Sequence, residues 1–80
     1  MQDALAKQLG QQVKALRLEA SYTQEKLAQE TGLSPRGIQK IEAGETSPKY
    51  ETLFKITESL NADPSLIVTS LWEFWQKNRD

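Results

Sequence analysis

The 80-residue sequence contains no cysteine and no histidine. Without thiols it can form neither a disulfide nor a thiolate nucleophile, and without imidazole it lacks the usual general base. The common zinc ligands are missing for the same reason, so we expect no metal site and no cofactor. A glycine-rich phosphate loop is also missing, and carboxylates, lysines and hydroxyls are the groups left for chemistry. The sequence therefore predicts that the protein is not an enzyme.

Long hydrophobic runs are also missing from the sequence. No apolar stretch is long enough to span a bilayer, and the N-terminal residues lack the core of a signal peptide. Hydrophobic residues make up 38% of the chain and charged residues 26%, which is ordinary for a globular protein. We therefore expect one small cytoplasmic domain over residues 1–80, without a membrane partner. A chain this short buries a modest core and can gain stability by forming oligomers.

The chain has no excess of positive charge, although nucleic-acid binders are usually basic. Ten Lys and Arg side chains stand against eleven Asp and Glu, for a net charge of −1 and a pI near 5.4. The distribution is uneven: residues 1–41 hold six basic and four acidic side chains, and residues 42–80 hold four and seven. A locally positive face on an acidic protein is compatible with DNA binding, with weak non-specific affinity.

Apolar residues recur at helical spacing along most of the chain, and caps, prolines and glycines punctuate the pattern. Leu5, Leu9, Val13, Leu16 and Ala20, for example, recur at spacings of three and four and mark one face of a first helix. The sequence predicts an all-α fold of five helices, over about 5–20, 24–31, 35–43, 49–60 and 64–76.

Two local features of these helices predict structural detail. Gly10 interrupts the first helix at a cost of about 1 kcal/mol relative to alanine, which indicates a looser N-terminal turn. In the fourth helix we expect a buried side made of Leu53, Phe54, Ile56 and Leu60. Both expectations follow from residue type and spacing alone.

The stretch Ser34 to Lys40 begins with a helix start, because Ser34 can cap and Pro35 suits the first helical position. Beyond it, Arg36, Gln39 and Lys40 point away from the apolar residues, and no acidic residue interrupts them. Donors on one face and a hydrophobic underside are what a helix needs to read the major groove. With the shorter helix upstream and the tight turn at 32–34, this is a helix-turn-helix pattern.

The last predicted helix has more apolar surface than one core face can bury. Ile67, Leu71 and Phe74 form one stripe. A second stripe, rotated by about a quarter turn, consists of Val68, Trp72 and Trp75. Large aromatics can wrap the edge of a small domain, and tryptophan is also favoured in protein interfaces. The second stripe is our candidate dimer or partner interface.

Several short motifs in order resemble the Cro/repressor (Xre) family of lambda-repressor-like helix-turn-helix proteins. Taken together they extend over most of the chain, and their spacings match those of the family. They are the segments 9–17, 23–28, 32–34 and 38–44, followed by Pro48, the segment 51–53 and Ile56. The resemblance implies a compact five-helix DNA-binding domain whose second and third helices form the helix-turn-helix.

The family resemblance also implies roles for single residues. It places the base-contacting positions on the third helix, where Gln39 joins them as an outward donor: Pro35, Arg36, Gly37, Gln39 and Lys40. Phosphate contacts are implied at Thr23, Gln24, Ser34 and Arg17. Arg17 and Glu42 match a charged pair that links the first helix to the third in the family, which gives Arg17 a structural role as well.

The sequence departs from the family pattern at four positions. Pro35 offers only apolar contact to a thymine methyl. Gly37 has no side chain to contact a base, but it permits close approach of the helix backbone to the DNA. Ser21 stands where the family usually has glycine after the first helix. Glu45 occupies a position that is often basic and close to the DNA backbone, so its carboxylate would repel phosphate.

These observations predict a sequence-specific regulator of transcription, most simply a repressor, that binds a near-palindromic operator in double-stranded DNA. It would act as a homodimer through its C-terminal helix. The alternative is a protein-interaction module or antitoxin of the same fold, with weak or no DNA binding of its own. The acidic second half, Glu45, Gly37 and the exposed aromatic stripe favour this alternative. In it, a protein partner would cover Trp72 and Trp75.

Overall fold

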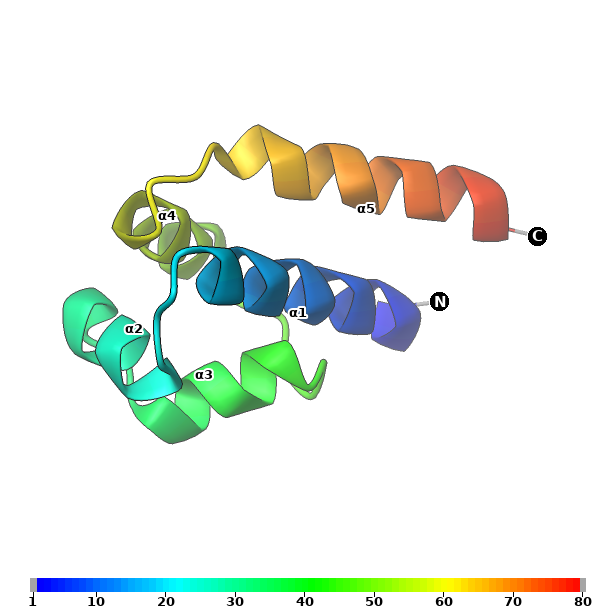
Figure 1. Cartoon of the computed structure of the whole chain (residues 1–80). Helices are drawn as coiled ribbons and strands as arrows, with labels where there is room; N and C mark the ends of the chain where they lie inside the picture. Colours follow the sequence, from blue (N-terminus) through cyan, green and yellow to red (C-terminus); the bar gives the residue numbers. More distant parts are fainter. Residues whose placement is uncertain (1, 80) are drawn as a thin grey trace.

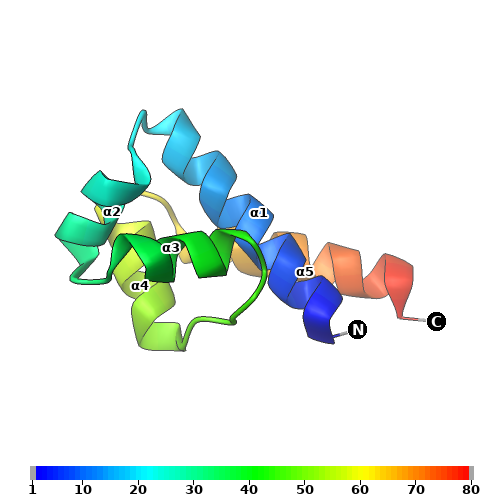
Figure 2. The same ribbon diagram turned by 90° about the horizontal axis from the view of Figure 1, so that it is seen from below.

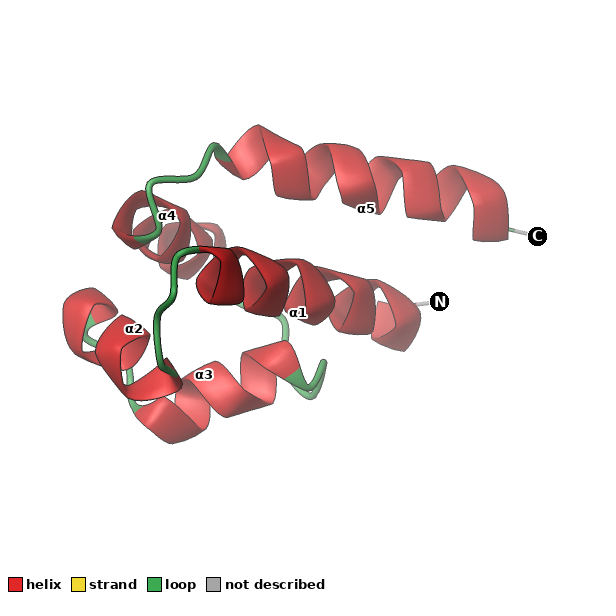
Figure 3. Ribbon diagram, in the orientation of Figure 1, coloured by secondary structure: helices red, strands yellow, loops and turns green. Residues whose placement is uncertain are grey.

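The computed structural model describes residues 2–79, which form five α-helices and no β-strand (Figure 3). The all-α fold class predicted from the sequence is confirmed. The helices are α1 (Gln2–Glu19), α2 (Gln24–Thr31), α3 (Pro35–Glu42), α4 (Tyr50–Ser59) and α5 (Pro64–Asn78).

The helix bounds differ from the predicted ones mainly at the two ends of the chain. α1 begins at Gln2 instead of Leu5. The predicted start was the first residue of the apolar stripe, and such a stripe gives no sign of a polar turn that precedes it. α5 continues past Gln76 to Asn78, whose side-chain Nδ2 donates a hydrogen bond of 2.9 Å to the carbonyl oxygen of Phe74. α3 and α4 are each one or two residues shorter than predicted.

α1 lies between α3 and α5, which pack against its opposite sides (Figure 1). α2 packs against α3 and α4, and α4 also contacts α5. The view from below shows α3 in front of the other helices, with its outer side uncovered (Figure 2). The radius of gyration is 12.0 Å, near the value of about 11.6 Å expected for a compact domain of this length.

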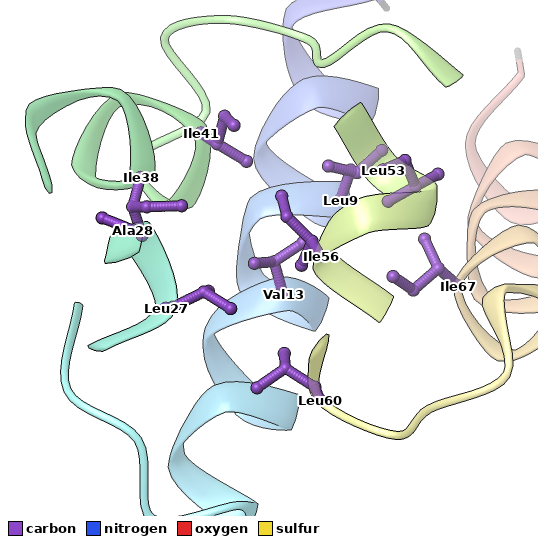
Figure 4. Packing of buried hydrophobic residues seen from close by; sticks show 10 residues of the cluster. All are labelled: Leu9, Val13, Leu27, Ala28, Ile38, Ile41, Leu53, Ile56, Leu60 and Ile67. Carbon is purple, nitrogen blue, oxygen red and sulfur yellow. The ribbon is translucent and has the colours of Figure 1, made fainter. Parts of the chain in front are cut away.

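The hydrophobic core sits where all five helices meet, and each helix contributes to it (Figure 4). Val13, Leu27, Ile38, Ile56 and Ile67 are completely buried, one from each helix in turn. Val13, Ile56 and Ile67 belong to the apolar stripes recognised in the sequence. The core therefore fixes α3 by its underside and leaves its other face to solvent.

Phe54 does not belong to the core, contrary to the prediction, because its side chain is 55% exposed. Thr57 is buried in its place, only 1% exposed. At about 100° per residue, Thr57 lies closer than Phe54 to the middle of the stripe formed by Leu53, Ile56 and Leu60. The Thr57 hydroxyl donates to the carbonyl oxygen of Leu53 at 3.1 Å, so its burial leaves no polar group unpaired.

Gly10 marks a close helix crossing and not a looser turn, which corrects the prediction for this residue. A Cβ atom at position 10 would overlap the carbonyl oxygen of Ile41 and lie 2.7 Å from that of Glu42. Only glycine therefore allows α1 to approach the end of α3 this closely. The turn after α1 forms with Ser21 at a φ of 60°, a left-handed conformation that costs a non-glycine residue about 1–2 kcal/mol.

Within residues 2–79, no helix combines the length and apolar character needed to cross a membrane. Residues 4–79, whose side chains the structure describes, contain no group of three or more acidic side chains placed to hold a metal ion. Every buried side-chain nitrogen or oxygen in this part of the chain has a hydrogen-bond partner.

Candidate nucleic-acid interface

α2 and α3 are joined by a tight turn, and the start of each helix is capped by a side chain. Thr23 Oγ1 accepts a hydrogen bond of 3.0 Å from the Lys26 amide at the start of α2. Gly32 adopts a φ of 77° at its end, and Ser34 Oγ then accepts a 2.9 Å hydrogen bond from the Gly37 amide. Pro35 occupies the first turn of α3. These local signals place α3 across α2 as in a helix-turn-helix.

The two faces of α3 are sharply different. Ile38 and Ile41 are buried against the rest of the domain, at 0% and 5% exposure. Arg36 and Gln39 are exposed on the other face, and Lys40 is half-buried there. Since the helix is only eight residues long, these three donors lie within about 12 Å of one another along its axis. The structure thus brings the predicted donors together on one uncovered surface.

A shallow hollow of about 170 Å³ lies along this surface. It is lined by Arg36, Gln39, Lys40, Ala43 and Glu45. Of the other two predicted base-contacting residues, Pro35 is exposed at the start of α3 and Gly37 is half-buried. Neither brings a side-chain donor, so the hydrogen-bonding capacity of the face rests on Arg36, Gln39 and Lys40.

A buried ion pair between Arg17 and Glu42 joins α1 to the end of α3. Arg17 Nε lies 2.6 Å from Glu42 Oε2, and Nη2 donates to Oε1 at 3.1 Å. Nη1 donates to the carbonyl oxygen of Tyr22 at 2.7 Å, and the amide of Gln24 donates to Glu42 Oε1 at 3.0 Å. The hydrogen bond to Glu42 raises the pKa of Arg17 above its ordinary value.

This network changes what can be expected of Arg17 and Gln24. The Arg17 guanidinium is buried and donates to three oxygen atoms inside the domain, so its placement supports the structural role and not the predicted phosphate contact. Gln24 is half-buried and uses one amide hydrogen on Glu42. Its second amide hydrogen remains for another acceptor.

A second polar network, which the sequence did not reveal, holds α2 against α4. Tyr22 Oη donates to Glu30 Oε1 at 3.0 Å, and Ser59 Oγ donates to the same oxygen at 2.7 Å. Both hydrogen bonds lower the pKa of Glu30, and the one from Ser59 has the larger effect. Lys26 Nζ lies 4.3 Å from the centre of the Tyr22 ring, within cation–π range. No sequence motif predicts this network, because Tyr22, Glu30 and Ser59 come from different segments of the chain.

The second stripe on α5 is exposed, as its position on the helix indicated. Val68, Trp72 and Trp75 are 58%, 59% and 38% exposed, respectively. Ile67, from the first stripe, is completely buried. α5 packs on α1, and Gln8 Nε2 donates to Ser70 Oγ at 3.1 Å across that contact. α5, which carries this stripe, lies on the side of α1 away from α3 (Figure 1).

The model of one protein family matches residues 13–67 of the chain, and its description is helix-turn-helix (HTH_3). The matched segment includes all of α2, α3 and α4. It thus contains the complete helix-turn-helix and the surface described above. No curated protein sequence matches the chain.

Several solved structures are similar to this one. The clp gene regulator ClgR from Corynebacterium glutamicum superposes with a TM-score of 0.83, at 20% identity, over 94% of this chain and 80% of that one. The restriction-modification controller protein C.AhdI from Aeromonas hydrophila gives 0.77, at 25% identity, over 80% and 97%. An HTH_3 family transcriptional regulator from Vibrio cholerae gives 0.78, at 33% identity, over 86% of this chain and 39% of that one.

Proposed function

The chain belongs to the HTH_3 helix-turn-helix family of DNA-binding transcriptional regulators, and we propose that it is a sequence-specific repressor of transcription. In this proposal it binds a near-palindromic operator in double-stranded DNA as a homodimer. The single observation that carries the proposal is the outer face of α3, where Arg36, Gln39 and Lys40 are gathered above buried isoleucines. A promoter occupied by the dimer is closed to RNA polymerase, which makes repression the simplest outcome.

The side chains of α3 suit contacts to base edges in the major groove. Arg36 and Lys40 lie one helical turn apart and can donate to guanine O6 and N7, each contact worth about 1–3 kcal/mol of discrimination when bidentate. Gln39 can pair with the N6 and N7 atoms of adenine. Pro35 offers an apolar surface to a thymine methyl, and Gly37 allows the helix backbone to approach the groove.

Phosphate contacts would fix the helix in the groove. Thr23 and Ser34 are exposed at the helix starts, and each hydroxyl oxygen accepts a capping bond. Their hydroxyl hydrogens are left free to donate to phosphate. Gln24 has one amide hydrogen left, and it lies at the N-terminus of α2, where the helix dipole attracts anions.

Dimerisation would place two copies of α3 on one side of the DNA. Val68, Trp72 and Trp75 are exposed on α5. This helix lies on the far side of α1 from α3, so pairing through α5 would leave both reading faces uncovered. Burying tryptophan is a favoured way to stabilise an interface. A two-fold dimer predicts an inverted repeat with half-sites about one helical turn, roughly 34–36 Å, apart.

Two similar proteins support a role in gene control. C.AhdI is named as a restriction-modification controller and the Vibrio cholerae protein as a transcriptional regulator. The exposed tryptophans favour a second candidate, in which the fold is a protein-interaction module or antitoxin. In that case a protein partner, and not a second copy, would cover Trp72 and Trp75.

Fluorescence anisotropy with labelled duplex DNA tests the reading face. We expect Arg36→Ala and Lys40→Ala to weaken binding to the operator by about 5- to 150-fold each, while thermal unfolding stays unchanged. Lys55→Ala removes an exposed cation from α4 and is the matched control, with little effect on binding. Equal, small effects of all three substitutions would contradict the role of α3 and favour the interaction module.

A further inference from the structure

Glu45 is the one acidic side chain among the five residues that line the hollow on α3. It is exposed, and residues 2–79 contain no ion pair between Glu45 and Arg36 or Lys40. A carboxylate beside the two cations of the reading face lowers the local positive charge that attracts DNA. Its position therefore calls for a function beyond solubility.

The backbone of Glu45 is fixed by α3 and is not part of a loose loop. The Gly44 amide donates to the carbonyl oxygen of Ile41 at 3.0 Å, and the Glu45 amide donates to that of Lys40 at 2.9 Å. Gly44 adopts a φ of 75°, and a Cβ atom there would lie 2.5 Å from Lys7 Cγ. The chain direction at position 45 is thus set by a glycine that tolerates no side chain.

We propose that Glu45 determines specificity by accepting a hydrogen bond from the N4 amino group of a cytosine at one position of each half-site. The inference rests on the proposed role of α3 as the reading helix. The family resemblance places position 45 close to the DNA backbone, but in this structure Glu45 lines the same hollow as Arg36 and Lys40. It would therefore face a base pair next to those that the two cations read, as well as the neighbouring phosphates.

Elementary electrostatics makes such a carboxylate selective. An ionised glutamate has only acceptor oxygens, so it repels phosphates and the acceptor atoms N7 and O6 of guanine or O4 of thymine. In the major groove the N4 amino group of cytosine is a donor, and acidic side chains are matched to it. Glu45 would lower the affinity of the protein for every duplex. The loss of affinity would be smallest where a cytosine faces the carboxylate.

The test compares the wild type with Glu45→Ala and Glu45→Gln in selection from a randomised duplex pool, followed by anisotropy titration. We expect Glu45→Ala to bind random duplex about fivefold more tightly, the size of one charge repulsion at about 4 Å in water. It should also lose preference for cytosine at one symmetric position by about 5- to 100-fold. Glu45→Gln removes the charge but keeps an acceptor, so it should keep part of that preference.

Glu58→Gln removes an exposed glutamate from α4 and is the matched control, expected to change neither quantity. A uniform rise in affinity for all sequences, with the base preferences unchanged, would overturn the proposal and leave Glu45 as a residue that only repels phosphate. No change in either quantity would overturn it as well. If the wild type itself enriches no inverted repeat, the regulator proposal fails first and this inference fails with it.

Discussion

Arg17 Nε lies 2.6 Å from Glu42 Oε2, in an ion pair whose side chains are 9% and 4% exposed. Arg17 is in the last turn of α1, and Glu42 is the last residue of α3. The same carboxylate accepts a hydrogen bond from Gln24 at the start of α2. One carboxylate thus ties three helices together and fixes the angle at which α3 is presented.

Removing one partner of this pair should destabilise the domain strongly. Arg17→Met keeps much of the side-chain volume but leaves the Glu42 carboxylate buried without its guanidinium. We expect the free energy of unfolding to fall by about 3–5 kcal/mol, as measured by urea denaturation. The double substitution Arg17→Met with Glu42→Leu should recover much of this loss, because no unpaired charge remains. Lys14→Met, exposed on the same helix, is the control, and a loss below about 1 kcal/mol for Arg17→Met would contradict the role of the pair.

Gly10→Ala should destabilise the domain although alanine is the better helix former. The added methyl would overlap the carbonyl oxygens of Ile41 and Glu42, and α1 would have to move away from α3. Overpacking of this kind costs about 1–3 kcal/mol, against a gain of about 1 kcal/mol in helix propensity. Ala15→Gly on the exposed side of α1 measures the propensity effect alone in the same urea experiment. A more stable Gly10→Ala protein would show that the crossing is loose.

Glu30 should give the stability a measurable pH dependence. Hydrogen bonds from Ser59 and Tyr22 lower its pKa from the ordinary 4.5, so the ionised form stabilises the fold. Since the folded pKa lies below the unfolded one, this stabilisation is complete above the unfolded value and is lost as the pH falls through the folded value. We expect the stability difference between the wild type and Glu30→Gln to be largest near pH 7 and to shrink below about pH 4.5. Urea titrations across this range measure it, and a constant difference would exclude the mechanism.

Trp72→Glu should separate the subunits of the proposed dimer. Placing a carboxylate in the exposed stripe of α5 would make burial of that stripe costly. Sedimentation equilibrium should give a dimer for the wild type and a monomer for the variant, which would then bind an inverted repeat more weakly than the wild type. Leu18→Glu, at an exposed leucine of α1, is the control. A wild type that is already monomeric at the concentrations that bind DNA would contradict dimerisation through α5.

Much of the fold follows from local signals in the sequence. Ser34 was recognisable as a helix start, and in the structure its hydroxyl oxygen accepts a capping hydrogen bond from the Gly37 amide. The apolar spacing located Val13, Ile56 and Ile67, which are completely buried, but in α4 residue type favoured Phe54 over the better-placed Thr57. Hydrophobicity alone cannot tell which residue at the edge of a stripe becomes buried.

The contacts that the sequence could not show are those between distant segments. Gln24 binds Glu42, eighteen positions away, and the chain alone does not show where its amide points. The close approach at Gly10 depends on the carbonyl oxygens of α3, which no periodicity in α1 records. By contrast, Arg36, Gln39 and Lys40 were predictable as a surface, because neighbours on one short helix share a face whatever the tertiary structure.

Selection from a randomised duplex DNA pool, with purified wild-type protein at moderate salt, tests the central claim most directly. The sequences retained should contain an inverted repeat whose half-sites are about one helical turn apart, with guanines at the positions read by Arg36 and Lys40. Retention of random sequences by a protein shown to be folded would contradict sequence-specific reading by α3.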